Sequence, residues 1–246
     1  MHDHAHEKKL IAAVLVVAAL AGAYVYARRD ARPAAPAPVL NEAPQQAPEP
    51  QVEGASVPAT PAEELVAAEG ETLYRIGAGS KASFTINEVL RGSPFTVVGE
   101  TADVTGDIAL DAANGKARIG LIAVDARTLK TDSRMRDGMI ARAILRSGEP
   151  DNAFITFKPT SIDGLPPAIA PGAPFDLGIT GDLTVAGATK QVTFKAAAQL
   201  TDDKIVAKAD TDVLYKDFGL AIPKVPFVAG TDDDLTISID IVAVKQ

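Results

Sequence analysis

Residues 179–194 read ITGDLTVAGATKQVTF. Apolar side chains alternate with polar ones from Ile179 to Val185, and alternation resumes at Val192 and Phe194. A period of two predicts β-strands with one dry face and one solvated face. The small residues at 186–188 (AGA) predict a turn between them.

The same alternation recurs along most of the chain after residue 72. Further strands are expected at 81–87, 104–110, 117–123, 153–157 and 235–241. Turn signals at 112–115, 163–167, 202–203 and 232–234 separate them. Eight or nine strands at this short spacing predict an all-β, antiparallel sandwich or barrel.

Composition excludes several function classes. The chain has no cysteine, and its 3 histidines all lie at positions 2, 4 and 6, in a short polar head without a second shell, so we expect no metal site and no cofactor. Its net charge of −8 argues against nucleic-acid binding. A carboxylate-dependent hydrolase stays open as an enzymatic alternative. Strand residues such as Asp107 and Asp182 are expected to face solvent, however, so no catalytic residue is assigned and we expect no enzyme.

A membrane segment is predicted near the N-terminus. After a polar head at 1–9, residues 10–27 (LIAAVLVVAALAGAYVYA) carry no charge and have basic pairs on both sides. As a helix they would extend about 27 Å, close to the hydrocarbon thickness of a bilayer. This favours a transmembrane helix or signal-anchor, with a cleaved signal peptide as the alternative.

Residues 28–70 are rich in Pro and Ala, which predicts a disordered linker. The folded domain is then expected at 71–246. We expect a single-pass protein of the inner (cytoplasmic) membrane with the domain in the periplasm or outside. The alternative is secretion to the periplasm after signal cleavage.

One segment departs from the strand pattern. Residues 131–133 (TDS) predict the N-cap of a helix over 134–146. Its expected apolar face comprises Met135, Met139, Ile140, Ala143 and Ile144, and its basic residues include Arg134, Arg136 and Arg142. These arginines are either an ordinary solvated helix face or a positive rim that binds an anionic headgroup. Arg136 could instead pair with Asp137.

Several motifs in order resemble the YceI-like family of lipocalin-like polyisoprenoid-binding domains, over about 74–244. The closest match is 181–190 (GDLTVAGATK), which is similar to the family's G-x-L-T-i-x-G-x-T-k. The others are at 74–76 (YRI), 98–108 (VGETADVTGDI), 124–131 (VDARTLKT) with 136–137 (RD), 154–157 (FITF) and 217–219 (DFG). Glu88 stands where many members carry His, and the loop at 165–174 is unusually rich in Pro. The resemblance implies an antiparallel eight-stranded barrel with one short helix that binds a long isoprenoid chain inside.

If the sheet closes, its dry face points inward and lines a tunnel. Alternation gives these inward-facing, ligand-binding candidates: Phe84, Ile86, Ile108, Ile119, Leu121, Ile155, Phe157, Leu183, Val185, Phe194, Ile237 and Ile239. Small residues such as Ala117, Gly181 and Ala196 are expected to leave room for a slender hydrocarbon. A solid core of the same side chains is the alternative.

The predicted function is non-enzymatic binding of a long-chain isoprenoid or similar amphiphilic lipid, of quinone or polyprenyl type, as a membrane-tethered carrier or sequestering protein. The alternative is a structural or interaction module of the cell envelope with a solid barrel. The expected partners are the lipid and the membrane, through 10–27. A homodimer is a possible assembly.

Overall fold

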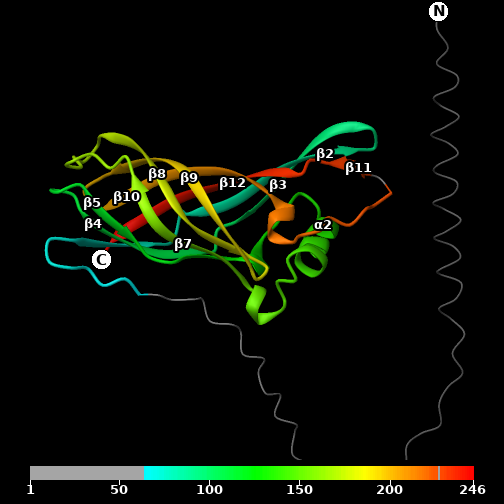
Figure 1. Cartoon of the computed structure of the whole chain (residues 1–246), viewed down its shortest axis with the longest axis horizontal. Coiled ribbons are helices and arrows are strands. Elements are labelled where there is room, and N and C mark those ends of the chain that lie inside the picture. Colours follow the sequence, from blue (N-terminus) through cyan, green and yellow to red (C-terminus); the bar gives the residue numbers. More distant parts are fainter. Residues whose placement is uncertain (1–63, 227) are drawn as a thin grey trace, which may run out of the picture. The chain divides into compact units, whose positions relative to one another are not determined.

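The computed structural model describes residues 64–226 and 228–246. The predicted polar head, the segment 10–27 and most of the predicted linker lie outside these residues. Among the described helices, none has the length and apolar character needed to span a bilayer. All the architecture below belongs to the part of the chain after residue 63 (Figure 1).

This part is mostly β-strand. The strands are β1 (Thr72–Ile76), β2 (Lys81–Leu90), β3 (Ser93–Thr101), β4 (Val104–Asp111), β5 (Lys116–Ile119), β6 (Ile122–Asp125), β7 (Phe154–Asp163), β8 (Pro174–Val185), β9 (Ala188–Leu200), β10 (Lys204–Leu214), β11 (Val228–Thr231) and β12 (Asp234–Lys245). The short helices are η1 (Ala126–Thr128), α2 (Arg134–Met139), η2 (Ile140–Ile144), η3 (Pro150–Asn152) and η4 (Tyr215–Phe218).

The strands form a closed antiparallel barrel. Neighbours follow the order β1-β4-β6-β7-β8-β9-β10-β12, and β1 pairs with β12 to close the ring of eight. The long β12 pairs with β1 at its C-terminal half and with β2 at its N-terminal half. β3 and β11 extend the sheet beside β2, towards the end of the barrel where α2 lies. The all-β, eight-stranded barrel expected from the sequence is thus confirmed.

Two tight hairpins fix the register of long strand pairs. In the β8–β9 hairpin, Val185 lies opposite Ala188, and the two linking residues Ala186 and Gly187 both have positive φ (48° and 80°). Positive φ at both positions is the requirement of a type I′ turn, whose twist matches that of the strands. The β2–β3 hairpin uses Arg91 (φ 52°) and Gly92 (φ 81°) in the same way.

The predicted helix is present but is not α-helical throughout. Ser133 is its N-cap, as expected, and accepts a 3.5 Å hydrogen bond from the Arg136 amide. After Met139 the helix continues as a π-helical turn, η2, in which the Leu145 amide donates to the Ile140 carbonyl at 2.8 Å. A π-turn contains one residue more than an α-turn, so the apolar face shifts along the chain.

Because of this shift, part of the predicted apolar face of the helix is wrong. Ala143 was expected to face the protein but is exposed, whereas Ile144 and the buried Leu145 line the barrel interior. Met135 also departs from the expectation, because 81% of its surface is exposed. Helical periodicity assumes a uniform α-helix, and the π-turn breaks that assumption.

Asp107 was expected to be solvated on the outer side of β4. It is instead only 8% exposed and forms an ion pair with Arg75 of β1, at 3.0 Å between Nε and Oδ1. The β1–β4 register places Asp107 directly beside Arg75. Burial of a charge is tolerated where a partner compensates it, which is what this register supplies.

Candidate functional site: an apolar cavity with a polar mouth

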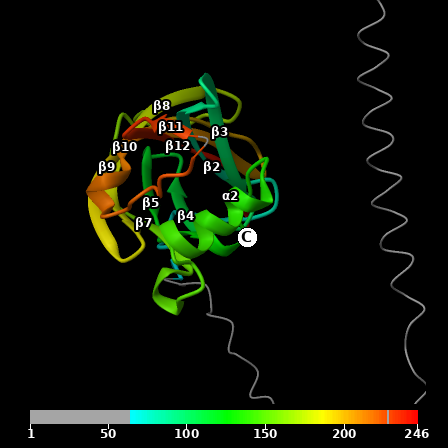
Figure 2. The same cartoon turned by 90° about the vertical axis from the view of Figure 1, so that its right-hand side faces the viewer.

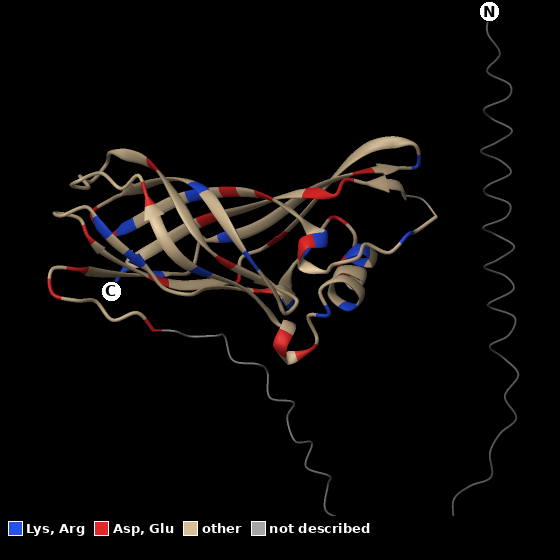
Figure 3. Ribbon diagram, in the orientation of Figure 1, with Lys and Arg blue, Asp and Glu red and all other residues tan. Residues whose placement is uncertain are grey.

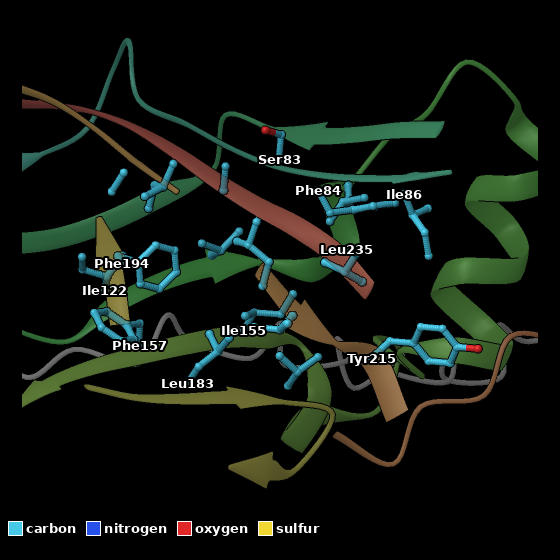
Figure 4. Close-up of a pocket in the computed structure, with 18 of the residues that line it drawn as sticks. Ser83, Phe84, Ile86, Ile122, Ile155, Phe157, Leu183, Phe194, Tyr215 and Leu235 are labelled. Atoms are coloured by element: carbon cyan, nitrogen blue, oxygen red, sulfur yellow. The ribbon is translucent and has the colours of Figure 1, made fainter. Parts of the chain in front are cut away.

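The barrel encloses a cavity of about 580 Å³. Every predicted inward-facing residue except Leu121 lines it, namely Phe84, Ile86, Ile108, Ile119, Ile155, Phe157, Leu183, Val185, Phe194, Ile237 and Ile239. Figure 4 shows several of these side chains converging on one space from opposite walls. Strand alternation predicted their direction correctly because each belongs to a regular stretch of antiparallel sheet.

Leu121 is the exception because the strand that was predicted at 117–123 is interrupted. β5 ends at Ile119 and β6 begins at Ile122, so two residues separate them. Before the interruption, the odd-numbered Ala117 and Ile119 face inward. After it, the even-numbered Ile122 and Val124 face inward, and all four residues line the cavity. A slip of one residue moves every following side chain to the other face of a sheet, and periodicity alone does not locate such a slip.

Small residues keep the cavity open, as the sequence suggested. Ala117, Ala196 and Ala198 are among the lining residues. Glycines on the wall also make room for aromatic rings: a Cβ at Gly181 would lie 2.8 Å from the Phe157 ring, and a Cβ at Gly99 would lie 2.2 Å from the Phe84 ring. Each ring therefore occupies space directly over a glycine of the adjacent strand, which holds it against the wall.

Aromatic side chains of the wall pack against each other. Phe157 and Phe194 meet edge to face, with ring centroids 5.0 Å apart. Such an arrangement is favoured by the charge distribution of aromatic rings and fixes both side chains. The interior therefore offers mainly dispersion contacts and little capacity for hydrogen bonds, which suits a hydrocarbon.

The cavity reaches the surface at the α2 end of the barrel, which faces the viewer in Figure 2. There the lining includes Met135 of α2 and the exposed Pro223 and Pro226 of the segment before β11. We call this opening the mouth. Most polar side chains of the lining belong to elements around it: Glu88, Ser133, Arg136, Tyr215 and Thr231.

Arg136 is held at the mouth by three neighbours. Its Nη2 lies 3.2 Å from Glu88 Oε1, its Nη1 binds Asp132, and its guanidinium lies 5.6 Å from the centroid of the Phe95 ring. The side chains of Arg136 and Glu88 are only 22% and 9% exposed. Glu88, which stands where many YceI-like proteins carry His, thus compensates the arginine charge inside the mouth.

The other two predicted arginines lie on the outer side of the same helix. Arg134 and Arg142 are exposed and do not line the cavity. Asp137 is not the partner of Arg136, because its Oδ1 accepts hydrogen bonds from the amide and hydroxyl of Thr131, both at 2.7 Å. Burial opposes ionisation of Asp137, but these bonds outweigh it and hold the pKa of the carboxyl below its usual range.

Sequence reasoning missed the segment after β10, which closes part of the mouth. Tyr215 is buried, lines the cavity, and its hydroxyl lies 3.4 Å from Asp233 Oδ1. Leu220, Ile222 and Val225 line the cavity from the same segment. These residues follow no period of two, so only the motif at 217–219 marked the segment at all.

The described residues contain no cluster of three or more His, Asp or Glu side chains arranged to hold a metal ion.

A closed antiparallel barrel with an apolar cavity and a polar mouth is the architecture of barrels that can enclose a hydrophobic ligand. The chain belongs to the YceI-like domain family, whose model matches residues 74–243.

Solved structures of low sequence identity share the fold. A polyisoprenoid binding domain from Saccharophagus degradans, implicated in plant cell wall breakdown, is 11% identical with a TM-score of 0.54, and the match covers 71% of this chain and 99% of that one. BcnA from Burkholderia cenocepacia is 17% identical with a TM-score of 0.52, covering 67% and 96%. No curated protein matches the chain.

Proposed function

We propose that the barrel binds the tail of a long-chain isoprenoid or similar amphiphilic lipid, of quinone or polyprenyl type, without chemical change to it. The observation that carries the proposal is the cavity of about 580 Å³ with its almost wholly apolar lining and polar mouth. Membership of the YceI-like family supports it, as does the fold shared with a domain described as polyisoprenoid binding.

Apolar burial is sufficient to drive such binding. Each methylene removed from water gains about 0.8 kcal/mol, so a tail of several isoprene units gains more than roughly 10 kcal/mol before losses. Ordering of the flexible tail offsets much of that gain. In this proposal the polar side chains of the mouth select the headgroup, and the tail supplies the affinity.

The hollow interior favours a binding protein over the alternative of a solid interaction module. A solid barrel would fill its interior with side chains at the density of a protein core, leaving few voids larger than a water molecule. The lining of Ala117, Ala196 and Ala198 instead leaves space that larger side chains would occupy.

The proposal includes attachment to a membrane. Residues 10–27, outside the described part, would tether the barrel to the inner membrane with the barrel in the periplasm or outside, as a carrier or sequestering protein. A tether raises the effective concentration of the barrel near a lipid donor. Secretion to the periplasm after signal cleavage is the alternative, and intact mass measurement of the purified protein distinguishes the two.

A matched pair of variants tests the cavity. Ala196 lines it, and its neighbour Ala197 is exposed on the outer side of the same strand. We expect native mass spectrometry of the whole chain, purified mildly from its own membranes, to show a bound amphiphile. Ala196→Trp should reduce uptake of an added prenyl lipid at least tenfold because the indole fills the space of the tail, and Ala197→Trp should leave uptake unchanged.

An apo mass together with no uptake of added prenyl lipid would refute lipid binding. Equal uptake by the two tryptophan variants would show that lipid binds outside the cavity. The same spectra report whether the protein is a monomer or the homodimer considered from the sequence.

A further inference from the structure

The mouth exposes apolar side chains to solvent. Met135 lines the cavity although 81% of its surface is accessible. Pro223 and Pro226 add exposed apolar surface from the segment before β11. Exposure of apolar side chains to water is unfavourable. Apolar side chains exposed at the rim of an apolar cavity therefore indicate a surface that is covered at some stage of function.

Basic residues surround these apolar groups. Arg91, Arg134, Arg142 and Lys224 are all exposed. They belong to the β2–β3 turn, to the helix and to the segment before β11, which are the elements that form the mouth, and Figure 3 shows Lys and Arg on each of these elements.

These mouth elements carry three carboxylates: Glu88, Asp132 and Asp137. Arg136 binds Glu88 and Asp132, and Thr131 donates to Asp137. The segment 220–226 contains no acidic residue. Residues 88–92, 131–146 and 220–226 thus carry six Lys and Arg against three Asp and Glu, so this side of the mouth has an excess of positive charge in a chain whose net charge is −8. The acidic residues at 217 and 232–234 lie on η4 and around the β11–β12 turn.

We propose that the mouth docks on the surface of an anionic lipid bilayer, with Met135 inserted between headgroups and the four basic residues bound to lipid phosphates. Exposed apolar groups within a basic rim are the combination that binds the bilayer interface. The cavity opens among these residues, so a lipid tail could pass between bilayer and barrel without crossing water. Passage of a lipid tail through the mouth rests on the proposed function, whereas docking of the mouth on a bilayer is measured separately.

The lack of cysteine allows a local test in the whole chain. A single Met135→Cys variant, labelled with an environment-sensitive fluorophore, reports contact of the mouth with a bilayer. The control label is Asp202→Cys, in the β9–β10 turn. There the Lys245 amide donates to the Asp203 carbonyl at 2.8 Å, beside the C-terminus and at the end of the barrel away from α2.

We expect vesicles of phosphatidylcholine with phosphatidylglycerol to shift the emission of the label at 135 to the blue and to leave the label at 202 unchanged. Pure phosphatidylcholine vesicles should give a much smaller response. An unresponsive label at 135, or an equal response to both kinds of vesicle, overturns the proposal.

Charge variants complete the test. R91Q, R134Q, R142Q and K224Q combined should weaken binding to these vesicles, reported by the label at 135, by roughly a hundredfold or more, because each basic residue near an anionic surface contributes about fivefold. The matched control removes the same charge elsewhere on the barrel, through K116Q, K195Q, K208Q and K245Q. Equal weakening by the two sets would mean that only net charge matters, and the docking surface would be rejected.

Failure of this inference and failure of the proposed function are distinguishable. Lipid binding measured by native mass spectrometry, together with a silent label at 135, rejects the docking surface alone. A responsive label on a barrel that takes up no lipid rejects the proposed function and keeps the docking surface.

Discussion

At the scale of single residues, the pair of Glu88 and Arg136 is the feature of the site with the clearest chemical consequence. The carboxylate and the guanidinium meet at 3.2 Å where both line the cavity, and Asp132 provides a second carboxylate. A guanidinium with two carboxylate partners presents little net positive charge to a ligand. Arg136 by itself therefore gives the cavity no strong electrostatic preference for an anionic headgroup.

Glu88→Gln should change that preference. Loss of the carboxylate leaves part of the Arg136 charge uncompensated in a poorly solvated position. We expect the ratio of affinities for a prenyl phosphate over the prenyl alcohol of equal length to rise about tenfold, measured by competition in native mass spectrometry.

The control for that experiment is Glu100→Gln, which removes the same charge from an exposed ion pair with Lys81 (3.1 Å) outside the cavity. It should leave the ratio unchanged. An unaltered ratio in Glu88→Gln would mean that the headgroup does not approach Arg136.

At the scale of elements, the helix at the mouth is anchored by a short polar network. Ser133 caps α2, and Thr131 holds Asp137 from the preceding loop. The first turn of the helix is thus tied to the loop that leads into it, before the π-turn directs Ile144 and Leu145 inward. Loss of this network should loosen the mouth before it affects the barrel.

Asp137→Asn tests the network through pH. The folded-state pKa of Asp137 is lowered, so its contribution to stability is present above the ordinary Asp pKa and is lost as pH falls through the folded value. At pH 7 the variant should unfold about 2–4 °C below the wild type, which corresponds to ~1 kcal/mol for a domain of this size.

This difference in unfolding temperature should shrink as pH falls from 5 towards 3. Thermal unfolding of both proteins at each pH measures it. A difference that stays constant over this range would show that the charge of Asp137 does not contribute, and that the loss arises from altered packing.

At the scale of the whole molecule, the barrel closes within its own strands. β1 and β12 pair through Tyr74–Lys245, Arg75–Val244 and Ile76–Ala243. The ring is therefore complete between residues 72 and 245, and a domain of similar fold is matched over 99% of its own length by 71% of this chain.

Removal of residues 1–63 should consequently leave the unfolding temperature of the barrel within about 2 °C of the full chain, by differential scanning calorimetry. Removal of β1 as well, by starting the chain at residue 77, should prevent cooperative unfolding because the ring then has an open edge. A large loss of stability on the first truncation would show that residues before 64 contribute to the folded domain.

The amino-acid sequence by itself determined the fold class and most of the cavity wall. Strand alternation is a local property, and in stretches such as 179–185 and 235–241 it assigns each side chain to one face without reference to the rest of the chain. The cap at Ser133 is local in the same sense, and so is the turn at Ala186 and Gly187.

Only the tertiary structure decided the features that depend on distant segments or on a change of phase. The interruption before Ile122 placed Leu121 outside the cavity lining, and the π-turn exposed Ala143. Glu88 and Arg136 are 48 residues apart in the chain and meet only when the ring closes. The cavity itself, and the basic mouth of an acidic protein, exist because closure brings side chains from separate elements to one space, and no local pattern contains that information.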